Sequence, residues 1–162
     1  MRVFHEKQQF RQWWLIALLS FTIGGIILNI YNKTDGFKNL EDYKLQVITL
    51  LITVIIIASI FILELRTKID SKGITANFKP FPFLERHYNW SEIDKIYVRK
   101  YSALTEYGGW GIRGFGKAKA YNVSGNYGIQ IVTKENKQFL IGTQKPQDVE
   151  RVLKRYTEKS SH

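Results

Sequence analysis

The residue spacing most suggestive of chemistry lies in one glycine-rich stretch, residues 107–116. Its glycines Gly109, Gly111 and Gly114 fit the G-x-G-x-x-G spacing of dinucleotide-binding loops. Such a loop binds a pyrophosphate only where it leads directly into the first turn of a helix. Residues 117–128 read KAKAYNVSGNYG, and their two glycines and turn-forming Asn and Ser argue against a helix. We therefore expect no nucleotide, and the sequence predicts no other cofactor.

The same stretch combines aromatic and cationic side chains, as binding edges often do. Trp110 and Phe115 could enter an interface while nearby Arg and Lys side chains contact phosphates or carboxylates. This combination suits an anionic membrane surface or an acidic peptide. In the alternative interpretation, the glycines only allow a tight strand connection and Trp110 packs on the core. The ligand-binding candidates, on this stretch and on a neighbouring strand, are Arg99, Lys100, Trp110, Arg113, Lys117 and Lys119.

No arrangement of residues indicates catalysis or a metal site. The chain contains no cysteine, which excludes disulfides, thiolate metal sites and cysteine nucleophiles. Its three histidines are far apart in sequence and show no metal-ligand spacing. Glu85, Glu92 and Asp94 flank a predicted turn without a nucleophile beside them, and Ser91 has no G-x-S-x-G context. The sequence predicts a non-enzymatic protein with no bound metal.

Two uncharged apolar blocks, residues 13–31 and 47–63, precede the polar part of the chain. At about 1.5 Å per helical residue, the first block is just long enough to cross a hydrocarbon layer of about 30 Å. The second block is rich in β-branched residues, but in lipid only a helix or a closed barrel satisfies its backbone. Gly24 and Gly25 offer a small-residue surface for packing between the two helices or, alternatively, between two copies of the chain. Residues 1–65 are therefore predicted to form a two-span transmembrane hairpin.

The flanking charges predict the orientation of this hairpin. The connection at residues 32–44 carries three Lys and three acidic residues, whereas the chain from Arg66 onward carries 18 Lys and Arg against 9 Asp and Glu. The positive-inside rule then places both termini in the cytoplasm and makes this a multi-pass protein of the cell (inner) membrane. A basic domain beside an anionic leaflet needs no nucleic acid to explain its charge, and no nucleic-acid-binding motif is present. We expect no nucleic-acid partner.

Residues 66–162 read as a β-rich domain that ends in a helix. Alternating and β-branched runs predict a hairpin at 67–70 and 74–78, a strand at 94–102, and a second hairpin at 127–133 and 138–143. Val149, Val152, Leu153 and Tyr156 repeat with helical spacing, which predicts an amphipathic helix over 146–158. The sequence therefore predicts an antiparallel sheet with one helix at its end, in an α+β protein.

The order of these elements resembles the bacterial pleckstrin-homology-like domains of small membrane proteins. The resemblance rests on the W-S-E-I step at 90–93, which leads into a strand, and on I-G-T at 141–143 followed by P-x-x-V at 146–149. It implies a split β-barrel capped by the C-terminal helix.

The function expected from these features is that of a membrane-anchored binding module. Our first hypothesis is a non-enzymatic domain that binds a protein partner or self-associates at the inner leaflet. The alternatives are a module that binds anionic lipid headgroups and an accessory subunit of a transporter or cell-envelope enzyme.

Overall fold

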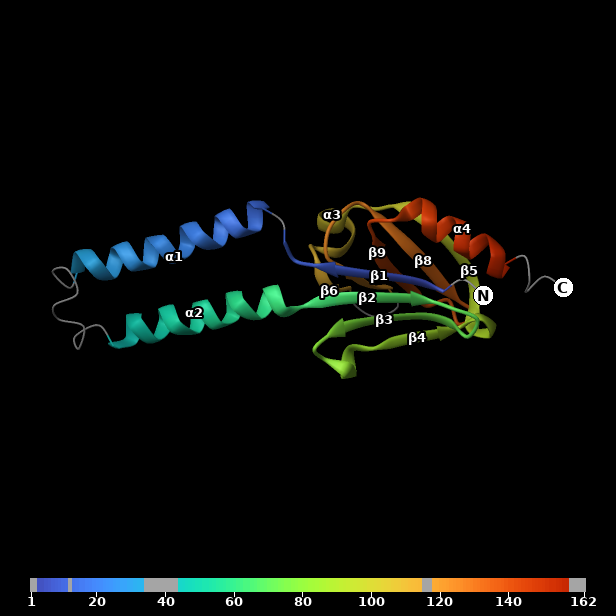
Figure 1. Cartoon of the computed structure of the whole chain (residues 1–162), viewed down its shortest axis with the longest axis horizontal. Helices are drawn as coiled ribbons and strands as arrows, with labels where there is room; N and C mark the ends of the chain where they lie inside the picture. The colour runs from blue at the N-terminus through green and yellow to red at the C-terminus, as the bar shows by residue number, and fades with distance from the viewer. Residues whose placement is uncertain (1–2, 12, 34–43, 115–117, 158–162) are drawn as a thin grey trace. The chain divides into compact units, whose positions relative to one another are not determined.

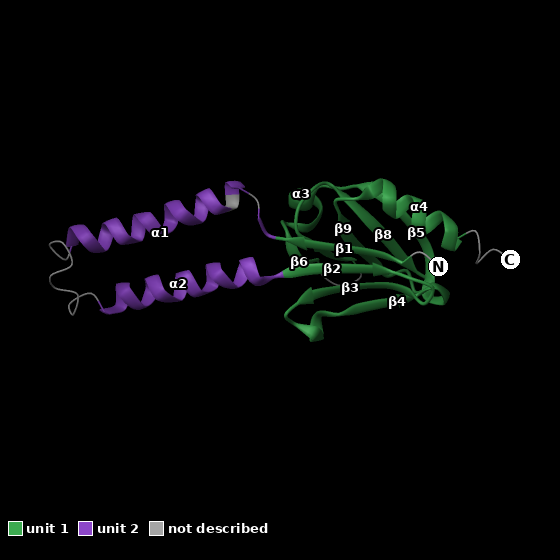
Figure 2. Ribbon diagram, viewed as in Figure 1, with its two compact units in different colours: residues 1–9, 64–162 green, residues 10–63 purple. Residues whose placement is uncertain are grey.

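The computed structural model describes residues 3–11, 13–33, 44–114 and 118–157. The chain divides into two compact units, which Figure 2 distinguishes by colour. Residues 10–63 form the helical unit, and residues 1–9 together with 64–162 form the β unit. The protein is α+β, with two helices that could span a membrane and two open sheets.

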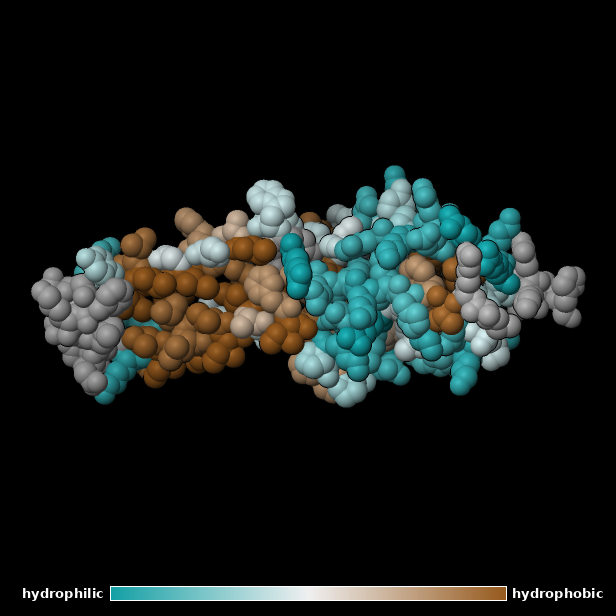
Figure 3. Space-filling model, in the orientation of Figure 1, coloured by the Kyte–Doolittle hydropathy of each residue, from teal (hydrophilic) through white to brown (hydrophobic). Residues whose placement is uncertain are grey.

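The helical unit consists of α1 (Trp13–Lys33) and α2 (Lys44–Ile62). Both are long and apolar enough to cross a membrane, and α2 has no buried residue. Their visible surface is mostly hydrophobic (Figure 3). The helices predicted over 13–31 and 47–63 are thus confirmed as helices. Between α1 and α2 the predicted close packing at Gly24 and Gly25 is not found, because an added Cβ at either position would meet no described atom of the chain within 4 Å.

The β unit begins with a strand that the sequence analysis did not predict, β1 (Phe4–Gln9). It pairs antiparallel with β2 (Glu64–Ile69), so that Phe4 lies opposite Ile69 and Gln9 lies opposite Glu64. The helical unit is therefore an insertion between two adjacent strands. This corrects the expected division at residue 65, since the first nine residues belong to the β unit.

Strand β1 was not predicted from the sequence because most of its buried side chains are polar. Phe4, Glu6 and Gln8 are buried, while the side chains between them are exposed. Two of these three inward residues are polar, so the hydrophobic alternation of a half-buried strand is missing. The Glu6 carboxylate accepts hydrogen bonds from Thr143 Oγ1 at 2.7 Å and from the Gln144 backbone N–H at 2.8 Å. Gln8 Nε2 donates to the Gly142 carbonyl at 2.7 Å.

The first sheet, sheet A, has the order β1-β2-β3-β4. Its β2–β3 hairpin confirms the predicted one, and its turn is held by Asp70, whose Oδ1 accepts from the Lys72 backbone N–H at 2.9 Å. Gly73 is required because a Cβ there would lie 2.0 Å from the Tyr88 carbonyl oxygen. The chain leaves the sheet at the predicted Pro80 and Pro82. The remaining elements of this part are β3 (Gly73–Lys79), the 3-10 helix η2 (Pro82–Leu84) and β4 (Arg86–Asn89).

The second sheet, sheet B, has the order β5-β8-β9-β7-β6. The predicted hairpin at 127–133 and 138–143 is confirmed as β8 and β9, with antiparallel pairing. The expectation of a purely antiparallel sheet is wrong, because β7 pairs parallel with β9. The W-S-E-I step forms the 3-10 helix η3 (Trp90–Glu92), which leads into β5. The other elements are β5 (Ile93–Lys100), α3 (Ala103–Tyr107), β6 (Gly111–Arg113), β7 (Ala118–Asn122), β8 (Tyr127–Thr133) and β9 (Gln138–Thr143).

Aromatic rings from both sheets build the core of the β unit. Tyr121 of β7 contacts Phe78 of β3 and Phe139 of β9, with ring centroids 5.2 and 5.0 Å apart. The predicted C-terminal helix is confirmed as α4 (Pro146–Thr157), which buries Val149 and Leu153 and runs beside β5 and β8 (Figure 1). Among the described residues the strands form two open sheets, so the implied split barrel is not seen as a closed barrel.

Candidate functional site

The structure distributes the predicted binding residues over two faces of sheet B. Arg113 lies opposite Ala120 in the β6–β7 register, and Ala120 packs in a cluster with Ala103 of α3. Lys119 alternates with Ala120 along β7, so it faces the other side, as does Tyr121. Strand β5, which carries Arg99, is three places from β7 in the sheet order, or about 14 Å at the usual strand spacing. These candidates therefore do not form one patch.

Arg99 is engaged in a polar network with α3. Its guanidinium forms an ion pair with Glu106 at 2.7 Å and donates to the Tyr107 hydroxyl at 3.3 Å and to Gln130 Oε1 at 3.0 Å. The hydrogen bond with Glu106 raises the pKa of Arg99 and, from the other side, lowers the pKa of Glu106. Arg99 therefore orients the short helix α3 on sheet B.

Trp110 packs against the cluster of buried residues beneath α3. Arg113 is exposed, and its Nε donates to the Trp110 carbonyl oxygen at 2.8 Å. Gly114 is required by a close approach, since a Cβ there would lie 2.2 Å from the Ala118 carbonyl oxygen. This geometry favours the interpretation in which the glycine-rich stretch connects strands. A strand, β7, follows these glycines where a dinucleotide-binding loop would require a helix.

The structure describes one of the two candidates Lys100 and Lys117. Lys100 is exposed, and its Nζ lies 5.5 Å from the centroid of the Tyr127 ring, within the range of a cation–π contact. Lys117 falls outside the described residues, as does Phe115, the second aromatic residue predicted at an interface.

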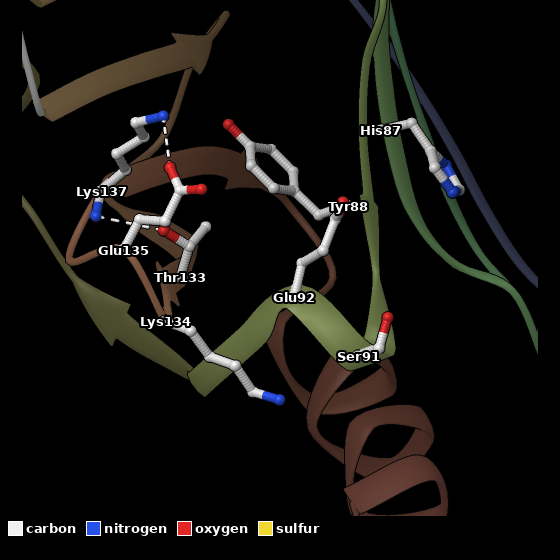
Figure 4. Close-up of a pocket in the computed structure, with 8 residues that line it drawn as sticks. All are labelled: His87, Tyr88, Ser91, Glu92, Thr133, Lys134, Glu135 and Lys137. Carbon is white, nitrogen blue, oxygen red and sulfur yellow. Dashed lines mark hydrogen bonds and ion pairs between the residues drawn. The ribbon is translucent and has the colours of Figure 1, made fainter.

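Lys119 lines a groove beside β4, which we call the β4 groove. It has two lobes, of 470 and 510 Å³, that share His87, Tyr88 and Lys137. Figure 4 shows the first lobe, with the Tyr88 ring pointing toward Glu135 and Lys137. The other lining residues are Ser91, Glu92, Thr133, Lys134 and Glu135 in the first lobe, and Glu85, Arg86, Lys119 and Gln138 in the second.

The carboxylates of the β4 groove already have partners. Glu85 accepts from Asn77 Nδ2 at 3.0 Å, and Glu92 accepts from the Asn89 backbone N–H at 3.0 Å. Glu135 pairs with Lys137 at 2.6 Å, which lowers the pKa of this carboxyl group.

Three cationic side chains of the β4 groove have no partner among the described residues. Among the described residues, no hydrogen bond or ion pair engages the side chains of Arg86, Lys119 or Lys134. They come from β4, β7 and the β8–β9 turn, so only the tertiary fold brings them together. The lining of the groove carries four Lys and Arg against three Glu, a net charge of +1, and its unengaged charged groups are cations.

The β4 groove also offers backbone and aromatic surface. Strand β4 is the last strand of sheet A, and within the described part of the chain it pairs only with β3. Tyr88 is half-buried, with its ring centroid 5.3 Å from that of Phe139, and burial raises the pKa of its hydroxyl. An open strand edge beside cations and an aromatic ring is suited to an extended acidic peptide.

The polar groups of this groove are not arranged for catalysis. Both ring nitrogens of His87 are engaged, Nδ1 2.8 Å from Thr75 Oγ1 and Nε2 3.1 Å from Asn89 Oδ1. In Figure 4 the His87 ring points away from Ser91, so the two do not form a nucleophile–base pair. Within the described ranges, no three His, Cys, Asp or Glu side chains are grouped to hold a metal ion.

Comparisons with protein-family models, curated proteins and solved structures found no match to this chain. The pleckstrin-homology-like resemblance therefore stays a prediction from the sequence.

Proposed function

We propose that this protein is a non-enzymatic, membrane-anchored module that binds an acidic, extended segment of a protein partner in the β4 groove. The observation that carries the binding proposal is the combination of unengaged Arg86 and Lys119 with the open edge of β4. The pleckstrin-homology-like architecture belongs to the same proposal, and two open sheets with a C-terminal helix are compatible with it.

The membrane-anchored part is supported by the composition and the connections of α1 and α2. A helix that exposes apolar side chains on every face needs an apolar solvent. Three residues separate Gln9 from α1, and one residue separates α2 from Glu64. Because Gln9 and Glu64 are paired in one sheet, two membrane-spanning helices would have to enter the bilayer from the same side.

The distribution of charge along the chain predicts how the two helices are oriented in the membrane. The β unit carries 20 Lys and Arg against 11 Asp and Glu, while the connection between the helices is balanced. The positive-inside rule then places the β unit, and with it both termini, in the cytoplasm. The excess positive charge would also increase the rate of encounter with an acidic partner.

The test is purification of the full-length protein from its native membrane in mild detergent, followed by mass spectrometry of the retained proteins and lipids. Two charge-reversal variants are compared with the wild type. Arg86→Glu with Lys119→Glu changes the β4 groove. Lys154→Glu with Arg155→Glu makes the same change in net charge on the exposed face of α4.

The proposal predicts one stoichiometric protein that the wild type and the α4 variant retain and the groove variant loses. Equal retention by all three would show that the groove is not the binding site. A groove variant that loses only anionic lipid would favour the alternative of a lipid headgroup binder.

A further inference from the structure

The turn between β3 and β4 presents two phenylalanines to the surface. Phe81 is 40% and Phe83 is 76% exposed, and their ring centroids lie 5.5 Å apart. Pro80 and Pro82 flank Phe81, and η2 follows in the chain, so the turn has few backbone conformations available. We call residues 80–84 the aromatic turn. Adjacent exposed aromatic rings on a rigid turn are typical of a contact surface.

The strand register places the aromatic turn at one particular end of sheet A. Lys79, the last residue of β3, lies opposite Glu64, and Glu64 lies opposite Gln9. Gln9 and Glu64 are the residues from which the chain leaves for α1 and returns from α2. Figure 1 shows the turn at the end of the sheet where β1 ends and β2 begins.

The short connections limit the distance along the chain from this end of the sheet to the first residue of α1 and to the last residue of α2. Trp13 follows Gln9 by four positions, which span at most about 14 Å in an extended chain. Ile62 precedes Glu64 by only two positions, or about 7 Å. Neighbouring strands lie about 4.8 Å apart, so the turn is a short distance from both connections.

We infer that the aromatic turn inserts into the lipid interface of the same membrane that α1 and α2 span. This inference rests on the proposed membrane anchoring. Aromatic side chains are favoured at the level of the lipid headgroups, where Trp13 and Trp14 at the start of α1 also belong. Lys79, directly before the turn, is exposed and suited to anionic headgroups.

The inserted turn has a mechanical consequence for the module. Two short connections alone leave the β unit free to tilt on the membrane. A third contact, at the aromatic turn of strand pair β3–β4, fixes the side of the unit that faces the lipid. The orientation of the β4 groove is then fixed as well, because β4 begins directly after the turn.

Because the chain contains no cysteine, a single introduced cysteine can be labelled with a thiol-reactive probe without labelling any other residue. We would introduce Phe83→Cys in the aromatic turn, Ser71→Cys in the β2–β3 turn at the other end of sheet A, and Ser59→Cys in α2. Each variant of the full chain is labelled with bimane and reconstituted in phosphatidylethanolamine and phosphatidylglycerol vesicles. Quenching by lipids that carry doxyl groups then reports contact with the bilayer.

The inference predicts quenching at positions 59 and 83 and none at position 71. Quenching at 59 without quenching at 83 would overturn the inference and leave the membrane anchoring intact. An unquenched label at 59 would overturn the anchoring itself, and with it the reason for the turn to meet lipid.

A second measurement removes the possibility that the label at position 83 drives its own insertion. Lys79→Cys is labelled in the natural background and in a background with Phe81→Ser and Phe83→Ser. Both phenylalanines are exposed, so the exchange should leave folding unchanged, as circular dichroism would check. The inference predicts that quenching at position 79 falls when the phenylalanines are removed. Equal quenching in the two backgrounds would contradict it.

Discussion

Helix α2 has no buried side chain and exposes apolar residues over most of its surface, whereas α4 confines its buried side chains to one stripe. None of the 19 residues of α2 is buried. In α4, Val149 and Leu153 are buried, while Arg151, Lys154 and Arg155 are exposed. Packing on sheet B stabilises α4, whereas the contact between α1 and α2 leaves every side chain of α2 at least partly exposed. The difference is that packing on sheet B buries the apolar side chains of α4, whereas the apolar side chains of α2 stay on the surface of the helical unit.

The largest expected effect comes from removing the helical unit. Because Gln9 and Glu64 are directly opposite each other, a two-residue Asn-Gly turn in place of residues 10–63 can join β1 to β2 as an ordinary hairpin. We expect this shortened chain to be soluble without detergent and folded. Size-exclusion chromatography and circular dichroism with a cooperative thermal transition would check this result.

The matching control is a chain that starts at Glu64 and lacks both the helices and β1. It leaves the buried partners of Glu6 and Gln8 without hydrogen bonds and exposes the edge of β2, so we expect it to aggregate. If this fragment folds as well as the chain with the Asn-Gly turn, β1 is not part of the β unit.

The second prediction compares one substitution in the two units. Phe139→Ala removes a ring that is 1% exposed and contacts Tyr88 and Tyr121, and it should lower the free energy of unfolding of the β unit by about 3–5 kcal/mol. Phe21→Ala removes a ring of α1 that is 83% exposed, so the unfolding of the β unit should not change. Urea titration of the full-length protein in detergent would measure both. Equal effects would show that the two units do not unfold separately.

The third prediction concerns the polar contact between β1 and the end of β9. Glu6→Ala leaves the buried Thr143 hydroxyl and the Gln144 N–H without their acceptor, which should lower the free energy of unfolding by about 1–3 kcal/mol. Lys7→Ala, on the exposed side of the same strand, should change it by less than about 0.5 kcal/mol. Urea titration of the chain with the Asn-Gly turn gives both values. A stability loss at Lys7 as large as that at Glu6 would contradict the assigned strand faces.

The smallest expected effect is a dependence of stability on pH from Glu106. Arg99 lowers the pKa of this carboxyl group below its ordinary value of 4.5, so the ion pair stabilises the folded state above pH 4.5. That contribution is lost as the pH falls through this value toward the lowered pKa. The side chains of Arg99 and Glu106 are 27% and 37% exposed, so solvent screens the ion pair. Its contribution to the free energy of unfolding should therefore be at the lower end of about 0.2–1 kcal/mol.

Thermal unfolding at several pH values would compare the wild type with Glu106→Gln. The difference between them should shrink as the pH falls below 4.5. A constant difference over the whole range would show that Glu106 acts through packing instead.

Local composition was enough to predict several elements from the sequence. Continuous apolar runs predicted α1 and α2, the spacing of Val149 and Leu153 predicted α4, and the turn residues between short apolar runs predicted two hairpins. In each case the residues that determine the element are neighbours in the chain, so a window of the sequence contains the information.

The features that were missed depend on residues far apart in the chain. Strand β1 turns Glu6 and Gln8 inward because their partners lie at residues 142–144, and nothing near β1 reveals them. The parallel pairing of β7 with β9 likewise has no local signal. The β4 groove was missed for the same reason, because Arg86, Lys119 and Lys137 come from three separate elements. Lys119 was a candidate from its charge, but its partners in the groove could not be identified.

The most direct test of the central claim is a topology measurement on the full-length protein in intact cells. His5→Cys in β1, Ser71→Cys in the β2–β3 turn and Thr34→Cys between the helices are treated with a membrane-impermeant maleimide, with and without permeabilisation. The account predicts that Thr34→Cys reacts in intact cells, while His5→Cys and Ser71→Cys react only after permeabilisation. Reaction of His5→Cys and Ser71→Cys on opposite sides, or of all three on the same side, would contradict it.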